Sequence, residues 1–220
     1  MRVGHCVLDL GCGTGKQTIP LAQLVGREGR IVAADISQPA LDQVLSQAKS
    51  LRLDDRIDLL LTELDDIGIH IDGKLFDRVL SCYALYYARD PHEVLSCAHR
   101  ALRVHGILFF CGPAHGNNAE LKRFYYALGG EKPQLETAAT VFMSEIGPQL
   151  ARQLFSSVRV CAFENVLSFD SPESLYRYWS SYNLYNQNVD SEFKRAASKY
   201  YEDHQVFETR KRVIGIQAMK

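Results

Sequence analysis

The residues best suited to chemistry lie in a short glycine-rich turn, Asp9-Leu10-Gly11-Cys12-Gly13-Thr14-Gly15. Glycines at alternate positions allow a sharp backbone turn and let a ligand approach where a Cβ atom would repel it. A dinucleotide fingerprint would require glycine or alanine at the next position, but Lys16 stands there. These residues do not match the P-loop motif G-x-x-x-x-G-K-[ST] either. The turn therefore predicts a binding loop of another kind.

The second candidate is Asp35, which lies twenty residues after Gly15 at the end of a predicted strand. An acid in this place can accept hydrogen bonds from both hydroxyls of a ribose. Each bond to such a charged acceptor contributes roughly 1.5–3 kcal/mol. The turn and the acid together predict a pocket for an adenosine-bearing cofactor at the carboxyl ends of the first two strands.

The elements that position this pocket alternate between strand and helix up to Pro113. Such alternation is typical of a parallel sheet with helices on both faces. The predicted strands cover residues 6–10, 30–35, 57–61, 76–81 and 107–111. The predicted helices cover residues 15–25, a segment that Pro39 opens, and a segment between Asp90 and Gly106.

The helix after Asp90 has the clearest signals. Asp90 can cap it, Pro91 occupies its first turn, and Glu93 stands where a capping box places an acid. Its predicted apolar face extends to Leu102, and Gly106 is predicted to end it.

Beyond Pro113 the pattern is irregular. Helices are predicted near residues 118–128, 147–155, 171–182 and 190–204, with a loop through Gly129-Gly130 and Pro133. Strands are predicted over residues 158–169 and 212–218. The fold class is therefore α/β, a doubly wound seven-stranded sheet with helical insertions after strand five. We expect one domain over residues 1–220, with a cofactor-binding half over 1–113 and a substrate-side half over 114–220.

An aromatic stretch in the second half has two interpretations. It can form a hydrophobic lid over a substrate, or it can simply pack a helix onto the sheet. Its members are Tyr176, Tyr178, Trp179, Tyr182 and Tyr185.

The composition limits the possible partners. The chain has 220 residues and a formal net charge of −1, which argues against nucleic acid or anionic lipid as the main partner. No window is apolar enough to span a membrane, and no signal peptide is evident. The six cysteines show neither C-x-x-C nor zinc-ligand spacing, so we expect a reduced, cytoplasmic protein without a metal. A homodimer is possible, and the sequence does not decide the oligomeric state.

Four segments resemble class I S-adenosylmethionine-dependent methyltransferases, in particular the small-molecule, ubiquinone-biosynthesis-like branch. These segments are Val7 to Gly15, Val32 to Ser37, Phe76 to Ser81 with Ala84-Leu85, and Leu95 to Leu108. The resemblance implies a Rossmann-like methyltransferase fold with an antiparallel last strand, and S-adenosylmethionine as the cofactor.

The resemblance also implies roles for single residues. Asp9 would support the turn, while Gly11, Gly13 and Gly15 would line the methionine and ribose moieties, with Cys12 as a small space-filler. Asp35 would bind the ribose hydroxyls. The remaining cofactor contacts would be made at the adenine and at the methionine end, by Ile36, Glu63 and Leu64 and by Ser81 and Cys82 respectively.

Three residues are candidates for contact with a methyl acceptor. His115 follows the fifth strand, where it would be a substrate-facing general base or a solvated loop residue. Tyr83 and Tyr86 follow the fourth strand, near the expected position of the methyl group. A phenol with a pKa of ~10 is a poor base at neutral pH, so these tyrosines are expected to contact substrate.

The sequence thus predicts methyl transfer to an O, N or C nucleophile of a small, partly apolar molecule. Two alternatives stay open. One is a non-catalytic binding protein, because only Met1-Arg2-Val3-Gly4 precede the first strand where the family has a pocket-covering segment. The other, weaker one is an RNA methyltransferase, for which Arg210-Lys211-Arg212 is the only basic run. DNA is not expected, since the sequence lacks a Pro-Pro-Tyr segment after strand four and a Pro-Cys dipeptide.

Overall fold

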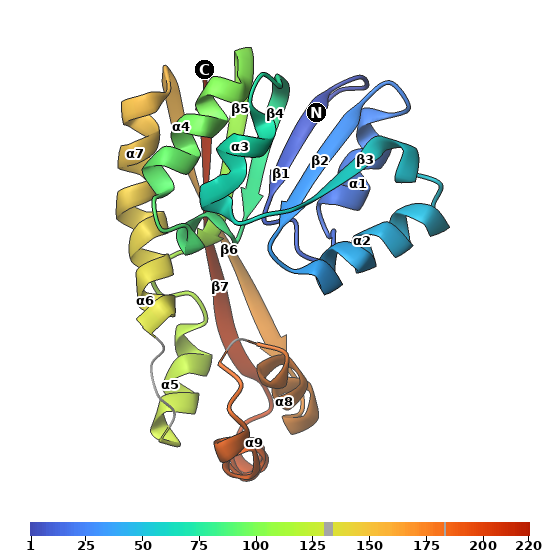
Figure 1. The fold of residues 1–220 in the computed structure, drawn as a ribbon. Coiled ribbons are helices and arrows are strands. Elements are labelled where there is room, and N and C mark those ends of the chain that lie inside the picture. Colours follow the sequence, from blue (N-terminus) through green and yellow to red (C-terminus); the bar gives the residue numbers. More distant parts are fainter. Residues whose placement is uncertain (130–133, 183) are drawn as a thin grey trace. The chain divides into compact units, whose positions relative to one another are not determined.

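The computed structural model describes residues 1–129, 134–182 and 184–220, with the side chains of residues 134–136 left out. It contains a seven-stranded sheet in the order β3-β2-β1-β4-β5-β7-β6 (Figure 1). Strands β1 to β5 pair in parallel, and the last strands are antiparallel, which confirms the predicted fold class. The strands are β1 (Cys6–Leu10), β2 (Arg30–Asp35), β3 (Ile57–Leu61), β4 (Phe76–Cys82), β5 (Leu102–Pro113), β6 (Ser157–Phe169) and β7 (Phe207–Met219).

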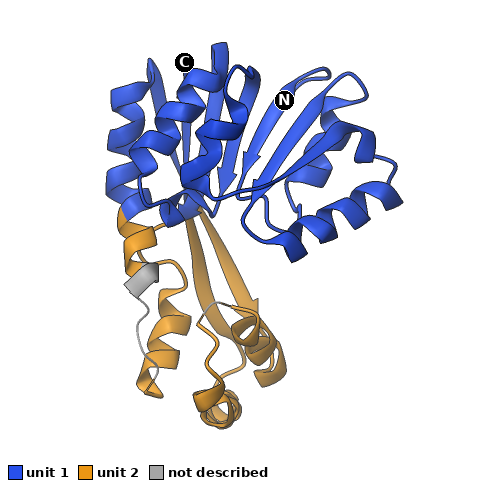
Figure 2. Ribbon diagram, in the orientation of Figure 1, with its two compact units in different colours: residues 1–112, 142–161, 214–220 blue, residues 113–141, 162–213 orange. Residues whose placement is uncertain are grey.

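The chain divides into two compact units (Figure 2). Unit 1 comprises residues 1–112, 142–161 and 214–220, and unit 2 comprises residues 113–141 and 162–213. The helices of unit 1 are α1 (Thr18–Val25), α2 (Gln38–Ser50), α3 (Ile67–Ile71), α4 (Pro91–Ala101) and α7 (Gly147–Leu154). Those of unit 2 are α5 (Ala119–Ala127), α6 (Gln134–Val141), α8 (Pro172–Ser180) and α9 (Asp190–Asp203).

Two apolar clusters cover the two faces of the sheet in unit 1. Successive residues of a strand point to opposite faces, so Val7 and Leu8 of β1 lie in different clusters. Leu8 packs with side chains of α3, α4 and α7, whereas Val7 packs with side chains of α1 and α2. Each such buried aliphatic side chain contributes about 1.5–3 kcal/mol. The sheet is therefore covered on both sides, as a doubly wound fold requires.

Side-chain caps fix the starts of three helices, and two of these caps, Asp90 and Ser171, were predicted. Ser37 accepts a hydrogen bond from the Ala40 N–H at the start of α2, and Asp90 accepts one from the Glu93 N–H at the start of α4. At the start of α8, Ser171 forms a capping box with Ser174. Each cap satisfies a backbone donor that the helix leaves unpaired.

The predicted end of the helix after Asp90 is wrong. Helix α4 ends at Ala101, and Leu102 has extended backbone and already belongs to β5, where it pairs with Phe76. The register then shifts, so that Arg78 pairs with Ile107, and Gly106 lies within this irregularity. A Cβ atom on Gly106 would lie 2.7 Å from a backbone oxygen, so the glycine serves a bulged strand and not a helix end.

Further differences from the prediction include the start of α1, the unpredicted helices α3 and α6, and the start of β7. Helix α1 begins at Thr18 and not at residue 15, because the glycine turn occupies the residues before it. Helix α3 was not predicted, since five residues are too few to show a helical period. Strand β7 begins at Phe207, five residues before the predicted start. The predicted loop includes Gly130 and Pro133, which lie outside the described residues.

The core of unit 2 is aromatic. Trp179 of α8 is fully buried and stacks on Phe193 of α9, with ring centroids 4.0 Å apart and planes 4° apart. The ring centroid of Tyr125 in α5 lies 6.0 Å from that of Trp179. Most of the predicted aromatic stretch therefore packs within unit 2, while its role as a lid stays a prediction.

Candidate functional site

The glycine turn between β1 and α1 has the backbone that its sequence predicts. Gly11, Gly13 and Gly15 all have positive φ angles, of 72°, 52° and 85°. A Cβ atom on Gly11 would overlap the Cβ atom of Ala84, whereas one on Gly13 would meet no atom of the described residues within 4 Å. The first glycine thus allows tight packing, and the second leaves open space beside the backbone for a ligand.

Asp35 holds the turn from the end of β2. One carboxylate oxygen accepts a hydrogen bond from the Gly13 N–H at 2.7 Å, and the other accepts one from the Ser37 N–H at 2.9 Å. A carboxylate offers about four acceptor positions. Asp35 is half-buried and can therefore accept further hydrogen bonds from a ligand while it keeps these two.

Asp9 lies beneath the turn and is 1% exposed. Its carboxylate accepts a hydrogen bond from the Thr18 hydroxyl at 2.7 Å. Burial raises the pKa of Asp9 to about 6, and the nearby Asp35 charge adds to this effect while the Thr18 bond opposes it. The turn therefore rests on a buried acid that is poised to lose its proton near neutral pH.

Cys12 is buried within the turn, and its thiol donates to the Gly13 carbonyl at 3.6 Å. Burial and the charges of Asp9 and Asp35 raise the pKa of Cys12 to about 12. This thiol therefore stays protonated and fills space, because only the thiolate is a nucleophile.

Ser81 and Cys82 end strand β4, next to β1 in the sheet. The Ser81 hydroxyl is buried and has no hydrogen-bond partner within the described structure. Buried polar groups are nearly always paired, so an unpaired one at the carboxyl edge of a sheet indicates a missing ligand or water. Cys82 is half-buried, and its pKa is raised first by a hydrogen bond to Cys111 and then by burial.

Comparisons with known proteins identify this arrangement. Residues 7–106 match the family model described as a methyltransferase domain, and this range holds the turn, Asp35 and Ser81. The chain carries a class I methyltransferase domain. The cofactor of this class is S-adenosylmethionine.

Two curated relatives act on quinones according to their names. The chain is 29% identical over 128 residues to a ubiquinone/menaquinone biosynthesis C-methyltransferase of Pseudoalteromonas translucida, which covers 57% of this chain and 50% of that protein. It is 31% identical over 106 residues to a demethylmenaquinone methyltransferase of Lactobacillus johnsonii, covering 48% and 43%. The chain thus spans about half the length of these relatives or less.

Solved structures share the fold at low identity. The YcgJ protein of Bacillus subtilis has a TM-score of 0.65 at 14% identity and covers 100% of this chain and 93% of its own. An arsenic(III) S-adenosylmethionine methyltransferase of Chlamydomonas reinhardtii has a TM-score of 0.60 at 19% identity, covering 99% and 64%. These likenesses support the methyltransferase fold.

The residues of this methyltransferase domain fit the cofactor at three points. The open space at Gly13 admits a ligand against the backbone, and Asp35 has acceptor positions left for ribose hydroxyls. The Ser81 hydroxyl lacks a partner among the described residues. Ile36 follows Asp35 and is 68% exposed, so an apolar side chain stands where adenine packing is predicted. The individual cofactor contacts stay predictions.

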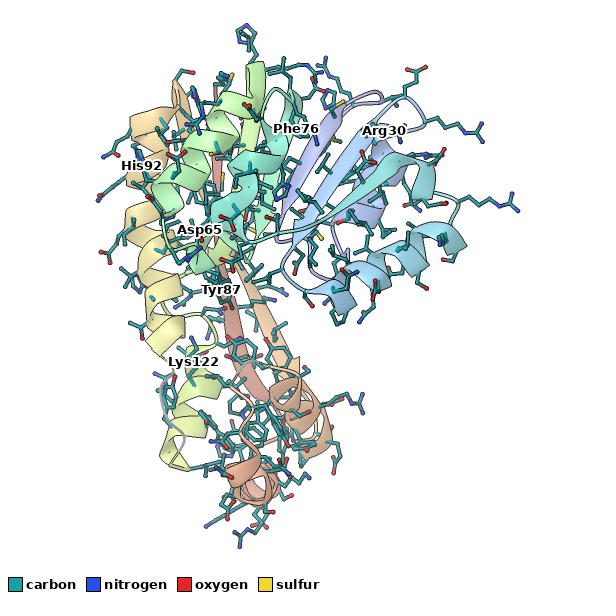
Figure 3. The ribbon with its side chains drawn as sticks, in the orientation of Figure 1. Arg30, Asp65, Phe76, Tyr87, His92 and Lys122 are labelled. Carbon is teal, nitrogen blue, oxygen red and sulfur yellow. The ribbon has the colours of Figure 1, made fainter. Side chains whose placement is uncertain are left out.

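Glu63 and Leu64, the other predicted adenine contacts, already have partners. Leu64 packs against the core cluster on the α3 and α4 face of the sheet. The carboxylate of Glu63 lies 3.0 Å from the guanidinium of Arg89, which also lies 3.5 Å from Asp65. Asp65, labelled in Figure 3, accepts hydrogen bonds from the backbone N–H groups of Arg89 and Asp90. Those bonds and the Arg89 charge hold the pKa of Asp65 below its usual range despite burial.

The two predicted tyrosines lie just beyond β4 in unit 1. Tyr83 has a left-handed backbone with φ of 59°, an uncommon conformation for a bulky residue, and its N–H donates to the Cys111 carbonyl at 2.8 Å. Its side chain is 40% exposed. Tyr86 is half-buried, and its ring lies 4.9 Å from that of Tyr87. Tyr83 is thus the more accessible of the two.

His115 belongs to unit 2, and the structure therefore does not relate it to the tyrosines. It is exposed and lines a cavity of about 390 Å³ within unit 2. Cations and hydroxyls dominate the other described lining residues, which are Gly116, Ala119, Lys122, Arg123, Tyr126, Thr137 and Thr140.

Three residues of the site were missed by the sequence reasoning. Thr18 binds Asp9, Ser37 binds Asp35 through its N–H, and Arg89 joins Glu63 to Asp65. A hydroxyl in the first turn after a glycine loop is a usable signal for Thr18. Arg89 gives no such signal, because its acidic partners lie more than twenty residues away.

Within residues 1–129, 134–182 and 184–220, no group of three or more His, Cys, Asp or Glu side chains could hold a metal ion. In the same ranges, no helix has the length and apolar character needed to cross a membrane.

Proposed function

We propose that this chain transfers a methyl group from S-adenosylmethionine to an O, N or C nucleophile of a small, partly apolar molecule by in-line displacement. The observation that carries the proposal is the turn Gly11 to Gly15, locked to Asp35 by a 2.7 Å hydrogen bond. The methyltransferase match over residues 7–106 supports it. The name of the ubiquinone/menaquinone biosynthesis C-methyltransferase relative favours carbon as the acceptor atom.

When bound, S-adenosylmethionine supplies an electrophilic methyl group on a sulfonium. The chain mainly has to hold the two reactants in line, and alignment of this kind lowers a barrier by ~7–11 kcal/mol. Asp35 would accept hydrogen bonds from the ribose hydroxyls, and the open space at the Gly13 backbone would let the cofactor approach. The Ser81 hydroxyl would donate to the methionine end, which gives this buried group the partner it lacks.

The methyl acceptor would be positioned by aromatic side chains after β4. Tyr83 and Tyr87 are 40% and 57% exposed, and exposed aromatic rings suit a partly apolar molecule. His115 stays a candidate general base for an acceptor that carries a proton at neutral pH.

The RNA alternative loses support from the ion pairs of unit 2. The guanidinium of Arg212 lies 2.7 Å from the carboxylate of Glu164. The guanidinium of Arg210 lies 3.6 Å from the carboxylate of Glu164 and 3.5 Å from that of Glu120. Two of the three cations in the only basic run are therefore neutralised within the protein. A phosphate backbone needs cations that can replace its counterions.

Calorimetric titration with S-adenosylmethionine tests the cofactor part of the proposal. The wild type is expected to bind, and Asp35→Ala to lose at least about 100-fold in affinity, because two bonds to a charged acceptor contribute about 3 kcal/mol or more. Asp58→Ala removes an exposed acid from the neighbouring strand β3 and serves as the control. Absence of wild-type binding, or equal losses in the two variants, contradicts the proposal.

Methyl transfer itself is tested with cofactor labelled on its methyl group. Hydroquinones, phenols and amines are offered as acceptors, and label is expected to move to one of them. A chain that binds cofactor yet leaves the label in place throughout the panel supports the non-catalytic alternative.

A further inference from the structure

Two cysteines face each other at the carboxyl edge of the sheet in unit 1. Cys82 is the last residue of β4, and its register partner in the parallel strand β5 is Cys111. Paired strands lie ~4.8 Å apart, and the Cys82 thiol donates a hydrogen bond to the Cys111 sulfur. The two sulfur atoms are thus held side by side by backbone pairing and not by a flexible loop.

Both thiols lie on the same face of the sheet and can be reached from outside. Side chains alternate along a strand, so Cys82 shares its face with Leu80, and Cys111 shares its face with Phe109. Leu80 and Phe109 are themselves register partners, which confirms the common face. Cys82 and Cys111 are both half-buried.

The surroundings favour the protonated form of Cys82. The hydrogen bond to Cys111, burial, and the negative charge of Asp9 all raise the pKa of Cys82. Disulfide formation starts from a thiolate, so a protonated Cys82 disfavours that route. A ligand whose own leaving oxygen takes up the thiol protons suits Cys82 in this form.

The number of sulfur ligands narrows the class of that ligand. Structural zinc takes four protein ligands, whereas no third His, Cys, Asp or Glu completes a metal cluster in the described part of the chain. A monosubstituted trivalent arsenical needs two thiols only, because its third position carries its own substituent. The hydrogen bond between the two sulfurs holds them within reach of one soft atom that bonds to both.

We propose that Cys82 and Cys111 form a dithiol site that binds a monosubstituted trivalent arsenical. With phenylarsine oxide as the probe, two As–S bonds form and the As–O bonds break. The oxygen leaves as water with the two thiol protons, and arsenic stays trivalent. No oxidant or reductant is consumed.

The experiment titrates the intact, reduced chain with phenylarsine oxide and follows adduct formation by intact-protein mass spectrometry. The wild type is expected to bind one arsenical tightly, with loss of one water. Cys82→Ser and Cys111→Ser are each expected to weaken binding at least 100-fold. The control is Cys161→Ser, which removes another half-buried thiol of unit 1 and should leave binding unchanged.

A competition step separates a dithiol chelate from attachment to one thiol. A small dithiol such as dimercaptopropanol should remove the arsenical, while an equal concentration of a monothiol should leave it bound. Thermal unfolding of both serine variants checks that they fold. Full binding in either variant, an equal loss in Cys161→Ser, or release by the monothiol overturns the proposal. Because the probe is not the methyl donor, failure here leaves the proposed function untouched.

Discussion

The glycine turn of unit 1 and the aromatic core of unit 2 are held by different kinds of contact. In the turn, the N–H groups of Gly11 and Cys12 both donate to the Ala34 carbonyl, and Gly13 donates to Asp35. In unit 2, side chains join distant segments: Asn117 donates to the Tyr182 hydroxyl, 65 residues away, and Asn118 to the Tyr178 hydroxyl, 60 residues away. The turn depends on backbone shape, and the core of unit 2 depends on matched side chains.

This difference explains which substitutions each region tolerates. A site built from backbone groups is damaged when a side chain is added, because a Cβ atom fills the space or strains the chain. A core built from large rings is damaged when a side chain is removed, because a cavity remains. The predictions below test this contrast, beginning with the largest effect.

Trp179→Ala is expected to lower the free energy of unfolding by about 3–5 kcal/mol, because it empties a fully buried aromatic position. Circular dichroism during denaturation measures the loss, since Trp179 is the single tryptophan and its fluorescence disappears with it. Phe163→Ala, at a position 56% exposed in unit 2, is the control and should cost under about 0.5 kcal/mol. Affinity for S-adenosylmethionine should stay within twofold while Trp179→Ala is folded, and a loss like that of Asp35→Ala contradicts the contrast.

The same contrast accounts for how much the sequence could predict. The strands from Cys6 to Leu10 and from Arg30 to Asp35 were predicted with correct ends, because buried β-branched runs and the glycine turn are local signals. The capped starts at Asp90 and Ser171 are local as well. Register between parallel strands then brings Asp35 to Gly13 without any further information.

Where the prediction failed, distant residues decide the structure. Leu102 fits a helical period, but pairing with Phe76 and burial in the core draw it into β5. Arg89 became part of the site only through Glu63 and Asp65, which lie on another loop. Neither contact can be predicted from the spacing of residues that are close in the sequence.

Gly11→Ala should destabilise unit 1 by about 2–5 kcal/mol and abolish detectable cofactor binding. The left-handed backbone costs about 1–2 kcal/mol for alanine, and overlap with Ala84 adds about 1–3 kcal/mol. Gly73→Ala is the matched control, because Gly73 has nearly the same φ, 70°, and open space around it. Gly73→Ala should lose only the about 1–2 kcal/mol that a left-handed backbone costs alanine, as measured by denaturation. Its affinity for the cofactor, measured by calorimetry, should be unchanged. Equal effects at the two glycines refute the idea that close packing makes Gly11 essential.

Asp9→Asn tests the buried acid beneath the turn. The pKa of Asp9 is raised to about 6 from an ordinary value of 3.8, so the folded state holds the proton more tightly than the unfolded state. This stabilisation is complete below about pH 4 and is lost as pH rises through 6. The wild type should therefore lose about 1–2 kcal/mol relative to Asp9→Asn between pH 5 and pH 8. Urea denaturation of both proteins at the two pH values measures the difference, and parallel stability profiles contradict the assignment.

Tyr83→Gly has the smallest expected effect on stability and the most informative sign. Tyr83 and Arg52 both have left-handed backbones, with φ of 59° and 55°, and Arg52 is exposed just after helix α2. Glycine relieves about 1–2 kcal/mol of strain at such a position but adds chain entropy of about 0.5–1 kcal/mol. Arg52→Gly should thus gain about 0.5–1 kcal/mol in denaturation experiments. Tyr83→Gly should gain less, because it also loses the contacts of a partly buried ring.

Transfer activity should separate the two variants. Arg52→Gly should keep the wild-type rate of methyl transfer, whereas Tyr83→Gly should lose at least tenfold, because strain at a bulky residue persists where the surrounding structure puts it to use. A Tyr83→Gly protein that is both more stable and fully active would mean that the conformation is tolerated and not used. A loss of both stability and activity would mean that Tyr83 acts through its side-chain contacts, as the aromatic residues in the core of unit 2 do. The contrast between a site that depends on backbone shape and a core that depends on side chains would then not hold at Tyr83.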